Sequence, residues 1–191
     1  MVKGMILIWT LLMMVSCTTK SDQLSEEEYA SFMLLGDSIA TEAQTVLMQN
    51  VAAAIQQGGT EYAVEFCNTR AIPLTDGVAD RMKVDIQRLS DKNRNPDNAI
   101  QSPLDSIAWQ RIQSKKTHFI EQDKNGEVYY YKPISIAMPT CIKCHGRKAD
   151  ISESTQKIIA QKYPYDKAIG YEMGDLRGMW KINWIRNDGQ K

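Results

Sequence analysis

The chain has 191 residues, of which 43% are hydrophobic, and its 23 Lys and Arg residues balance its 23 Asp and Glu residues. This length suits a single domain with a sizeable core rather than two domains. Because the net charge is zero and the basic residues form no cluster along the sequence, nucleic acid is not expected as a partner.

A lipoprotein signal peptide is predicted at residues 1–16. The apolar run Met5–Val15 is too short to span a bilayer. It is followed by Ser16-Cys17, which resembles the lipobox of bacterial lipoproteins, where the peptide is cut before an acylated cysteine. We therefore expect a lipidated Cys17, a linker up to residue 24, and a protein anchored by lipid to a membrane of the bacterial cell envelope, facing the periplasm or the cell exterior. The alternative is an ordinary secretory signal with an incidental cysteine.

A long helix is predicted to begin after Ser25. Ser25 and Glu28 have the capping-box spacing that satisfies free amides at a helix start. Apolar residues then recur at intervals of three and four between residues 32 and 55, as they do on one face of a helix. Gly58-Gly59 marks the expected end of this helix.

A second helix is predicted from about Thr60. It carries Ala63, Phe66 and Cys67 on nearly one face, so we expect Cys67 to face the core. Pro73 has no amide proton and is expected to bend or end the helix. Cys67 is also a thiol without an obvious partner in an exported chain, which calls for an explanation because such compartments are oxidising.

The rest of the pattern alternates between strands and helices. The clearest element is a hairpin, because Asn125-Gly126 separates two runs rich in aromatic and branched residues. The predicted elements are a strand at 84–89, a loop at 93–98, a helix at 104–112, the hairpin at 117–136, a helix at 152–162 and a strand at 178–186. Together they predict one α+β domain over residues 25–191, with a long N-terminal helix and an antiparallel sheet flanked by helices.

Residues Cys141-Ile142-Lys143-Cys144-His145 form a C-x-x-C-H motif. This is the attachment motif of haem c, in which the two thiols bond to the haem vinyl groups and the histidine ligates the iron. The motif predicts one covalent haem, with Cys141 and Cys144 as thioethers and His145 as proximal ligand. A thioredoxin-like redox pair would sit at the start of a helix in a βαβ unit, and a zinc site would need a second ligand pair. Neither context is found in the sequence.

The sixth ligand of such an iron would decide its properties. A methionine raises the reduction potential, a second histidine gives a closed low-spin site, and a thiolate favours the ferric state. His118 lies at a predicted strand start, Met138 is too close to the motif, and Met173 or Met179 can be core residues. Cys67 is the thiolate candidate, and its alternative is that of a buried, inert thiol.

Further segments of the chain form a pattern with the C-x-x-C-H motif. They are AVEFC at 63–67, Arg88, Ser90, Arg94-Asn95-Pro96, Asn98, Tyr131, Pro133, Ile134, PTCIKCHG at 139–146, Tyr163-Pro164, Asp166, Ala168, Gly170-Tyr171 and residues 174–178. This pattern resembles a family of single-haem c-type domains with a PAS-like sensor fold, catalogued as a domain of unknown function. Such domains occur alone in exported proteins and as extracytoplasmic input modules of bacterial signalling proteins.

The resemblance implies a ligand set and a fold. In the family the iron is held by the motif histidine and by the cysteine of the helical segment, which implies His145 and Cys67 here. It also implies a PAS-like antiparallel sheet flanked by helices. Arg88, Arg94 and Arg177 fall in matching segments, and one or two of them are candidates to pair with the haem propionates. The alternative is that they brace loops through carbonyl contacts.

Two functions follow from these expectations. The first is a membrane-anchored redox or gas sensor, in which Cys67 leaves the iron on reduction or is displaced by a diatomic gas, and which signals through a separate protein. The second is an electron-transfer cytochrome that serves a membrane oxidoreductase. An enzyme is not expected, because two axial ligands leave no open coordination position and His118 is the one further histidine.

Overall fold

The computed structural model describes residues 23–184. The predicted signal peptide, Cys17 and most of the linker lie outside this range. Within it, no helix combines the length and the apolar character that crossing a membrane requires. The elements are α1 (Glu26–Met82), β1 (Val84–Leu89), α2 (Pro103–Lys115), β2 (Phe119–Gln122), β3 (Val128–Ser135), α3 (Pro139–His145), α4 (Glu153–Lys162) and β4 (Leu176–Trp184), with 3₁₀ turns at Pro96–Asn98 and Lys148–Asp150.

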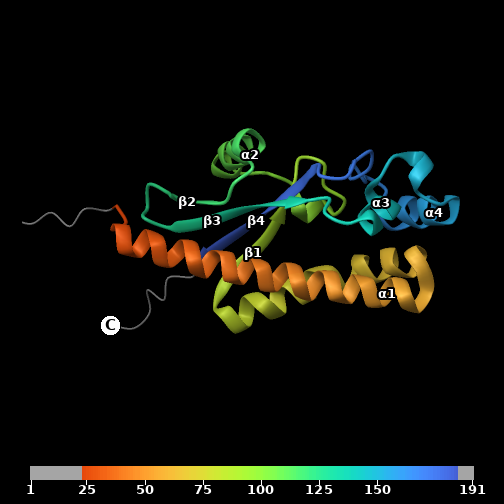
Figure 1. Cartoon of the computed structure of the whole chain (residues 1–191), viewed down its shortest axis with the longest axis horizontal. Helices are drawn as coiled ribbons and strands as arrows, with labels where there is room; N and C mark the ends of the chain where they lie inside the picture. Colours follow the sequence, from red (N-terminus) through yellow and green to blue (C-terminus); the bar gives the residue numbers. More distant parts are fainter. Residues whose placement is uncertain (1–22, 185–191) are drawn as a thin grey trace, which may run out of the picture.

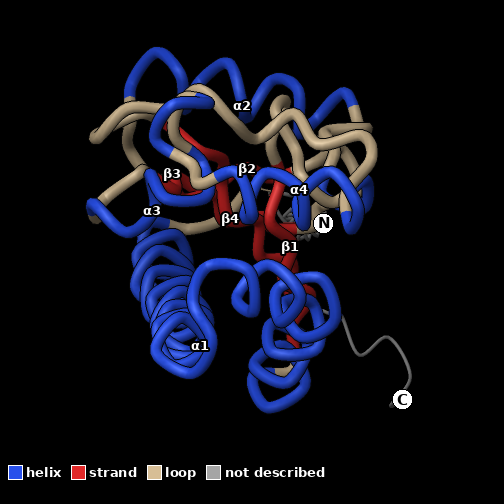
Figure 2. Tube along the Cα trace, turned by 90° about the vertical axis from the view of Figure 1, so that its right-hand side faces the viewer, coloured by secondary structure: helices blue, strands red, loops and turns tan. Residues whose placement is uncertain are grey.

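Helix α1 consists of two arms joined by a sharp turn. The predicted capping box is formed, since the Glu28 amide donates to Ser25 Oγ at 3.2 Å and the Ser25 amide donates to Glu28 Oε2 at 2.9 Å. The helical backbone is interrupted at Gly58 and Gly59, and Gly59 has φ +73°, a conformation that residues with a side chain rarely adopt. Figure 2 shows the two arms side by side below the sheet. The predicted break at Gly58-Gly59 is confirmed.

The second arm continues through Pro73 to Met82, so the expectation that Pro73 could end the helix is wrong. A proline removes only one helical hydrogen bond. The arm is held by burial of Ala71 and Val78, which are 5% and 0% exposed in the main core. This tertiary packing outweighs the local preference of proline.

The four strands form one antiparallel sheet in the order β1-β4-β3-β2. The predicted hairpin is formed by β2 and β3, and its loop is closed by a hydrogen bond from the Asp123 amide to the Glu127 carbonyl at 2.9 Å. Gly126 has φ +78° in this loop, as three-residue hairpin loops require. The terminal strand begins two residues earlier than predicted, and its predicted last residues, 185 and 186, lie outside the described range.

Helices cover both faces of the sheet, α1 on one side and α2 on the other (Figure 1). Successive residues of a strand point to opposite faces. Accordingly, Tyr130 packs in the core under α1 and Tyr131 in the core under α2, and both are 0% exposed. Their hydroxyls donate to Asp37 at 3.0 Å and to Asp105 at 2.8 Å. The predicted α+β class and PAS-like arrangement of a sheet flanked by helices are confirmed.

The contact between Gly36 and Tyr130 gives a test of this packing. A Cβ atom at position 36 would lie less than 3 Å from the Tyr130 ring. Gly36→Ala should therefore lower the free energy of unfolding by about 1–3 kcal/mol. Gly77→Ala is the matched control, because its Cβ would meet no atom closer than 3.9 Å and should raise the free energy by about 0.4–1 kcal/mol. Urea unfolding measures both, and equal effects would contradict the packing described.

Candidate functional site

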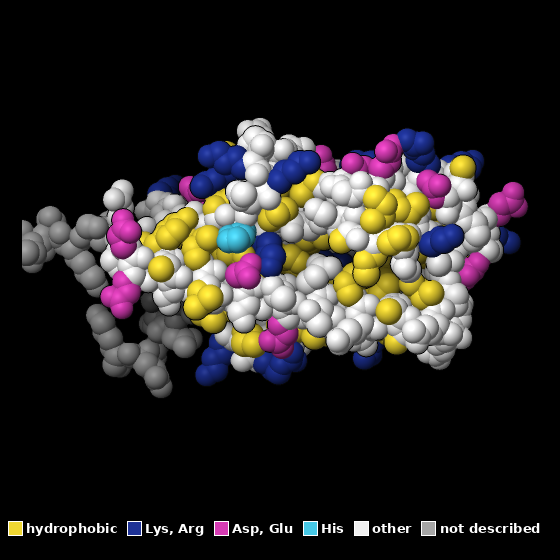
Figure 3. Space-filling view, viewed as in Figure 1, with side chains coloured by type: hydrophobic (Ala, Val, Ile, Leu, Met, Phe, Trp, Pro, Cys, Tyr) yellow, Lys and Arg dark blue, Asp and Glu magenta, His cyan; other side chains and the backbone are white. Residues whose placement is uncertain are grey.

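A cavity of about 330 Å³ lies between α1 and the segment around α3. Both arms of α1 line it with apolar residues, and β1 and the residues after β3 complete the wall. Figure 3 shows hydrophobic side chains around a hollow in the half of the molecule where Figure 1 places α3 and the turn of α1. The four residues predicted to hold the haem and its iron line it together: Cys67, Cys141, Cys144 and His145.

The C-x-x-C-H motif lies within helix α3, a helical context that the sequence analysis did not predict. Pro139 is at the start of this helix, where the missing amide costs nothing. The helix ends at His145 and is capped by Gly146, where a Cβ would lie 2.6 Å from the Ile142 carbonyl oxygen, so only glycine fits without a shift. The motif is not part of a βαβ unit, since every pair of neighbouring strands in the described sheet is antiparallel.

His145 is held in one orientation by the backbone of the segment before β4. Its Nδ1 lies 2.8 Å from the Ala168 carbonyl oxygen. A carbonyl can only accept a hydrogen bond, so Nδ1 carries the proton and Nε2 keeps its lone pair. The amides of Gly170 and Tyr171 also donate to the carbonyls of Gly146 at 2.7 Å and His145 at 3.0 Å.

The imidazole of His145 is kept neutral by its surroundings. Burial lowers its pKa well below the usual value, and Arg94, Arg177 and Arg88 act in the same direction. The hydrogen bond to Ala168 opposes this shift. A neutral histidine with a free Nε2 is the form that binds a metal ion.

Cys67 reaches the same cavity from the second arm of α1 and has no disulfide partner among the described residues. Burial raises the pKa of its thiol, and the charges of Arg88 and Arg94 partly offset this. The other sixth-ligand candidates are placed differently. His118 is exposed before β2, Met173 is 50% exposed and Met179 is buried under α2, and none of the three lines the cavity.

Two methionines do line the cavity, Met138 and Met48. Met48 lies on the first arm of α1 and was missed by the sequence analysis. It falls within the apolar stripe of that helix, and nothing in the sequence distinguishes it from a core residue.

The three arginines singled out by the sequence line the cavity but have different partners. Arg94 forms an ion pair with Asp166 at 3.0 Å and donates to the Cys144 carbonyl at 2.7 Å. Arg177 donates to the Lys92 carbonyl at 3.2 Å. For Arg88 no ion pair or side-chain hydrogen bond is found with the described residues, and its guanidinium carbon lies 5.9 Å from the centre of the Trp180 ring. Arg94 and Arg177 thus brace loops through contacts with carbonyl groups, whereas Arg88 makes no such contact with the described residues.

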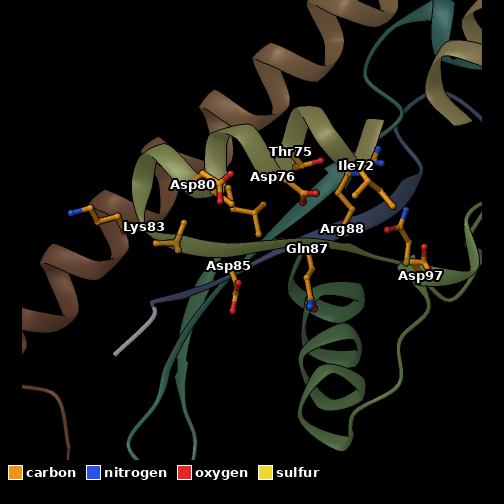
Figure 4. Close-up of a pocket in the computed structure, with 13 residues that line it drawn as sticks. Ile72, Thr75, Asp76, Asp80, Lys83, Asp85, Gln87, Arg88 and Asp97 are labelled. Carbon is orange, nitrogen blue, oxygen red and sulfur yellow. The ribbon is translucent and has the colours of Figure 1, made fainter. Parts of the chain in front are cut away.

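A second and larger groove, of about 830 Å³, runs between the second arm of α1 and β1 (Figure 4). It is lined mainly by polar side chains, four of them aspartates, and contains none of the thiols or His145. Arg88 lies beside Ile72 at one end of this groove, and both residues also line the smaller cavity. Arg88 therefore lies between the groove and the smaller cavity.

The burial of Cys144 has a measurable consequence. Its pKa is raised to about 11, mainly by burial, and only the thiolate reacts with iodoacetamide. While the thiol is unmodified, Cys144 should be alkylated on the order of 10²-fold more slowly at pH 8 in the folded chain than in concentrated urea, where thiols have a pKa of about 8.5. Peptide mass spectrometry measures the two rates, and equal rates would show that Cys144 is not buried.

The comparisons with known proteins agree with this geometry. Residues 20–184 match the model of the Tll0287-like family. The crystal structure of the cyanobacterial heme-protein Tll0287 is similar, with a TM-score of 0.63 and 25% sequence identity over 88% of this chain and 100% of that one. No curated protein matches the chain. The family resemblance predicted from the motifs is confirmed, and because the family model matches residues 20–184, most of the chain, the chain belongs to the Tll0287-like family.

Proposed function

We propose that the chain binds one haem c covalently in the cavity between α1 and α3. The observation that carries this proposal is that Cys141, Cys144, His145 and Cys67 line one apolar cavity although they come from two distant parts of the chain. Its support from known proteins is the likeness to a structure described as a heme-protein. Cys141 and Cys144 would form the two thioether bonds, and His145 and Cys67 would be the axial ligands.

The donor set fits a low-spin iron with two protein ligands. His145 offers Nε2 while its Nδ1 proton is held by the Ala168 carbonyl, which fixes the ring and makes the nitrogen a better donor. Cys67 lies on the α1 side of the cavity and the motif on the α3 side. A bound haem would supply an iron that exchanges one electron and binds diatomic gases, and a thiolate ligand would favour its ferric state.

The charges of the cavity suit the two carboxylates of a haem. Arg88 carries a buried guanidinium for which no anionic partner is found in the described range, and burial lowers its pKa. A buried cation of this kind is costly unless an anion neutralises it. We therefore assign a propionate to Arg88 in preference to Arg94, whose guanidinium is already paired with Asp166. Arg177 is the second candidate, because it lines the same wall and forms no ion pair with the described residues.

We further propose that the protein is an exported, lipid-anchored cytochrome whose role is redox or gas sensing. The observation that favours sensing is that Cys67 lies on α1, the helix whose two arms cover a whole face of the sheet. Release of Cys67 from the iron would reach the sheet through this packing, and a separate protein would receive the signal. Electron transfer is the alternative, favoured by the closed site that two axial ligands give. Neither role requires catalysis by this chain.

The role of Cys67 can be tested by substitution. Cys67→Ala should leave the haem covalently attached but convert the ferric iron from low to high spin, because one axial ligand is lost. Cys144→Ala is the matched comparison and should instead lose one thioether bond. Absorption spectra and denaturing gels stained for haem measure the two effects. An unchanged Cys67→Ala spectrum would rule out thiolate ligation.

The two roles can be separated by adding CO to the reduced protein. A sensor should lose the Cys67 ligand on reduction and bind CO rapidly, with a shift of its Soret band. An electron carrier should keep a low-spin reduced spectrum that CO does not change. If the mature wild-type protein carries no covalent haem at all, the proposed function is wrong.

A further inference from the structure

We infer that the ion pair of Arg94 and Asp166 positions His145 and sets the reduction potential of the iron that this histidine would hold. The inference rests on the proposed function, since it requires the haem. It concerns two residues that would not touch the iron, and it assigns to Arg94 a role other than that of a propionate partner.

The pair is buried and makes two contacts. Arg94 Nε and Nη2 donate to Asp166 Oδ1 and Oδ2 at 3.1 and 3.0 Å. The two side chains are only 11% and 8% exposed. Such bidentate, charge-assisted pairs are geometrically specific, and burial protects them from screening by salt.

Both members of the pair hold the residue that orients His145. Asp166 Oδ1 accepts a hydrogen bond from the Ala168 amide at 2.9 Å. The Ala168 carbonyl accepts from His145 Nδ1 at 2.8 Å and from Arg94 Nη2 at 3.4 Å. Arg94 also donates to the carbonyl of Cys144, the residue before His145, at 2.7 Å. The pair therefore fixes the acceptor of the histidine proton and the backbone that carries the histidine.

The position of the pair also has an electrostatic consequence. Arg94 withdraws electron density from the oxygen that accepts the Nδ1 proton, which weakens the donation from His145 to the iron. Asp166 neutralises the charge of Arg94. If either residue is made neutral, one unpaired charge stays in a poorly solvated place close to His145. A positive charge there stabilises the reduced iron, and a negative charge stabilises the oxidised iron.

Opposite shifts of the potential distinguish this role from that of a simple structural brace. Asp166→Asn should shift the reduction equilibrium at least tenfold toward the ferrous form, which is 59 mV for a one-electron couple. Arg94→Gln should shift it at least tenfold toward the ferric form. The double variant has no net charge at this place and should return to within about threefold of the wild type. A brace would be broken in all three variants, so their shifts would share one sign.

The measurement is a spectroelectrochemical titration of the mature haem protein at constant salt. The ion pair of Arg147 and Glu172 provides the control, because it also lies next to the motif but its side chains are 68% and 62% exposed. Arg147→Gln should change the equilibrium less than threefold, because water and salt screen exposed charges. Arg94→Lys keeps the positive charge, so its reduction potential should return to that of the wild type, in contrast to Arg94→Gln.

The outcomes are separable from those of the proposed function. Shifts of one sign, or shifts below threefold in both single variants of a protein that carries its haem, would overturn the inference while leaving haem binding intact. If Arg94→Gln does not accumulate, the test compares Asp166→Asn with the double variant, because these two differ only by the charge of Arg94. The reduction equilibrium of the double variant must then lie at least tenfold further toward the ferric form than that of Asp166→Asn. A wild type without haem would overturn the proposed function itself.

Discussion

The turn at Gly58 and Gly59 is the constraint on which the rest of the structure depends. It folds α1 back on itself, so that both arms lie on one face of the sheet and Cys67 returns to the cavity lined by the first arm. Without the left-handed conformation of Gly59, one continuous helix would carry Cys67 away from the motif. The burial of the core under α1 and the composition of the cavity are therefore consequences of one backbone turn.

The segment from Tyr163 to Asp175 is the second support of the site. It contributes no side chain that would bond to the iron, yet its backbone accepts the proton of His145 and pairs with the end of α3. Asp166 and Arg94 tie this segment to the loop after β1. Three segments far apart in the sequence thus converge on one imidazole, which gives that ring a single orientation before any metal is bound.

The cavity combines apolar walls with an excess of positive charge. Burial lowers the pKa of both Arg88 and Arg177, and neighbouring guanidinium groups add to the shift of Arg177. Asp166 neutralises only one of the three arginines. Such an excess is unfavourable in the empty fold and favourable when an apolar group with carboxylates is bound, so stability and ligand preference have the same electrostatic origin.

Short-range patterns in the sequence were sufficient to predict most of the helices and strands and to identify the haem-attachment motif. The capping box at Ser25, the glycine pair, the hairpin around Gly126 and C-x-x-C-H each depend on residues within a few positions of one another, and sequence exposes such relations directly. The course of α1 through Pro73, the place of Met48 in the cavity, and the separate partners of Arg88, Arg94 and Arg177 were decided by tertiary structure alone. Each of these depends on contacts between residues distant in the chain, and packing at such contacts outweighs local preference.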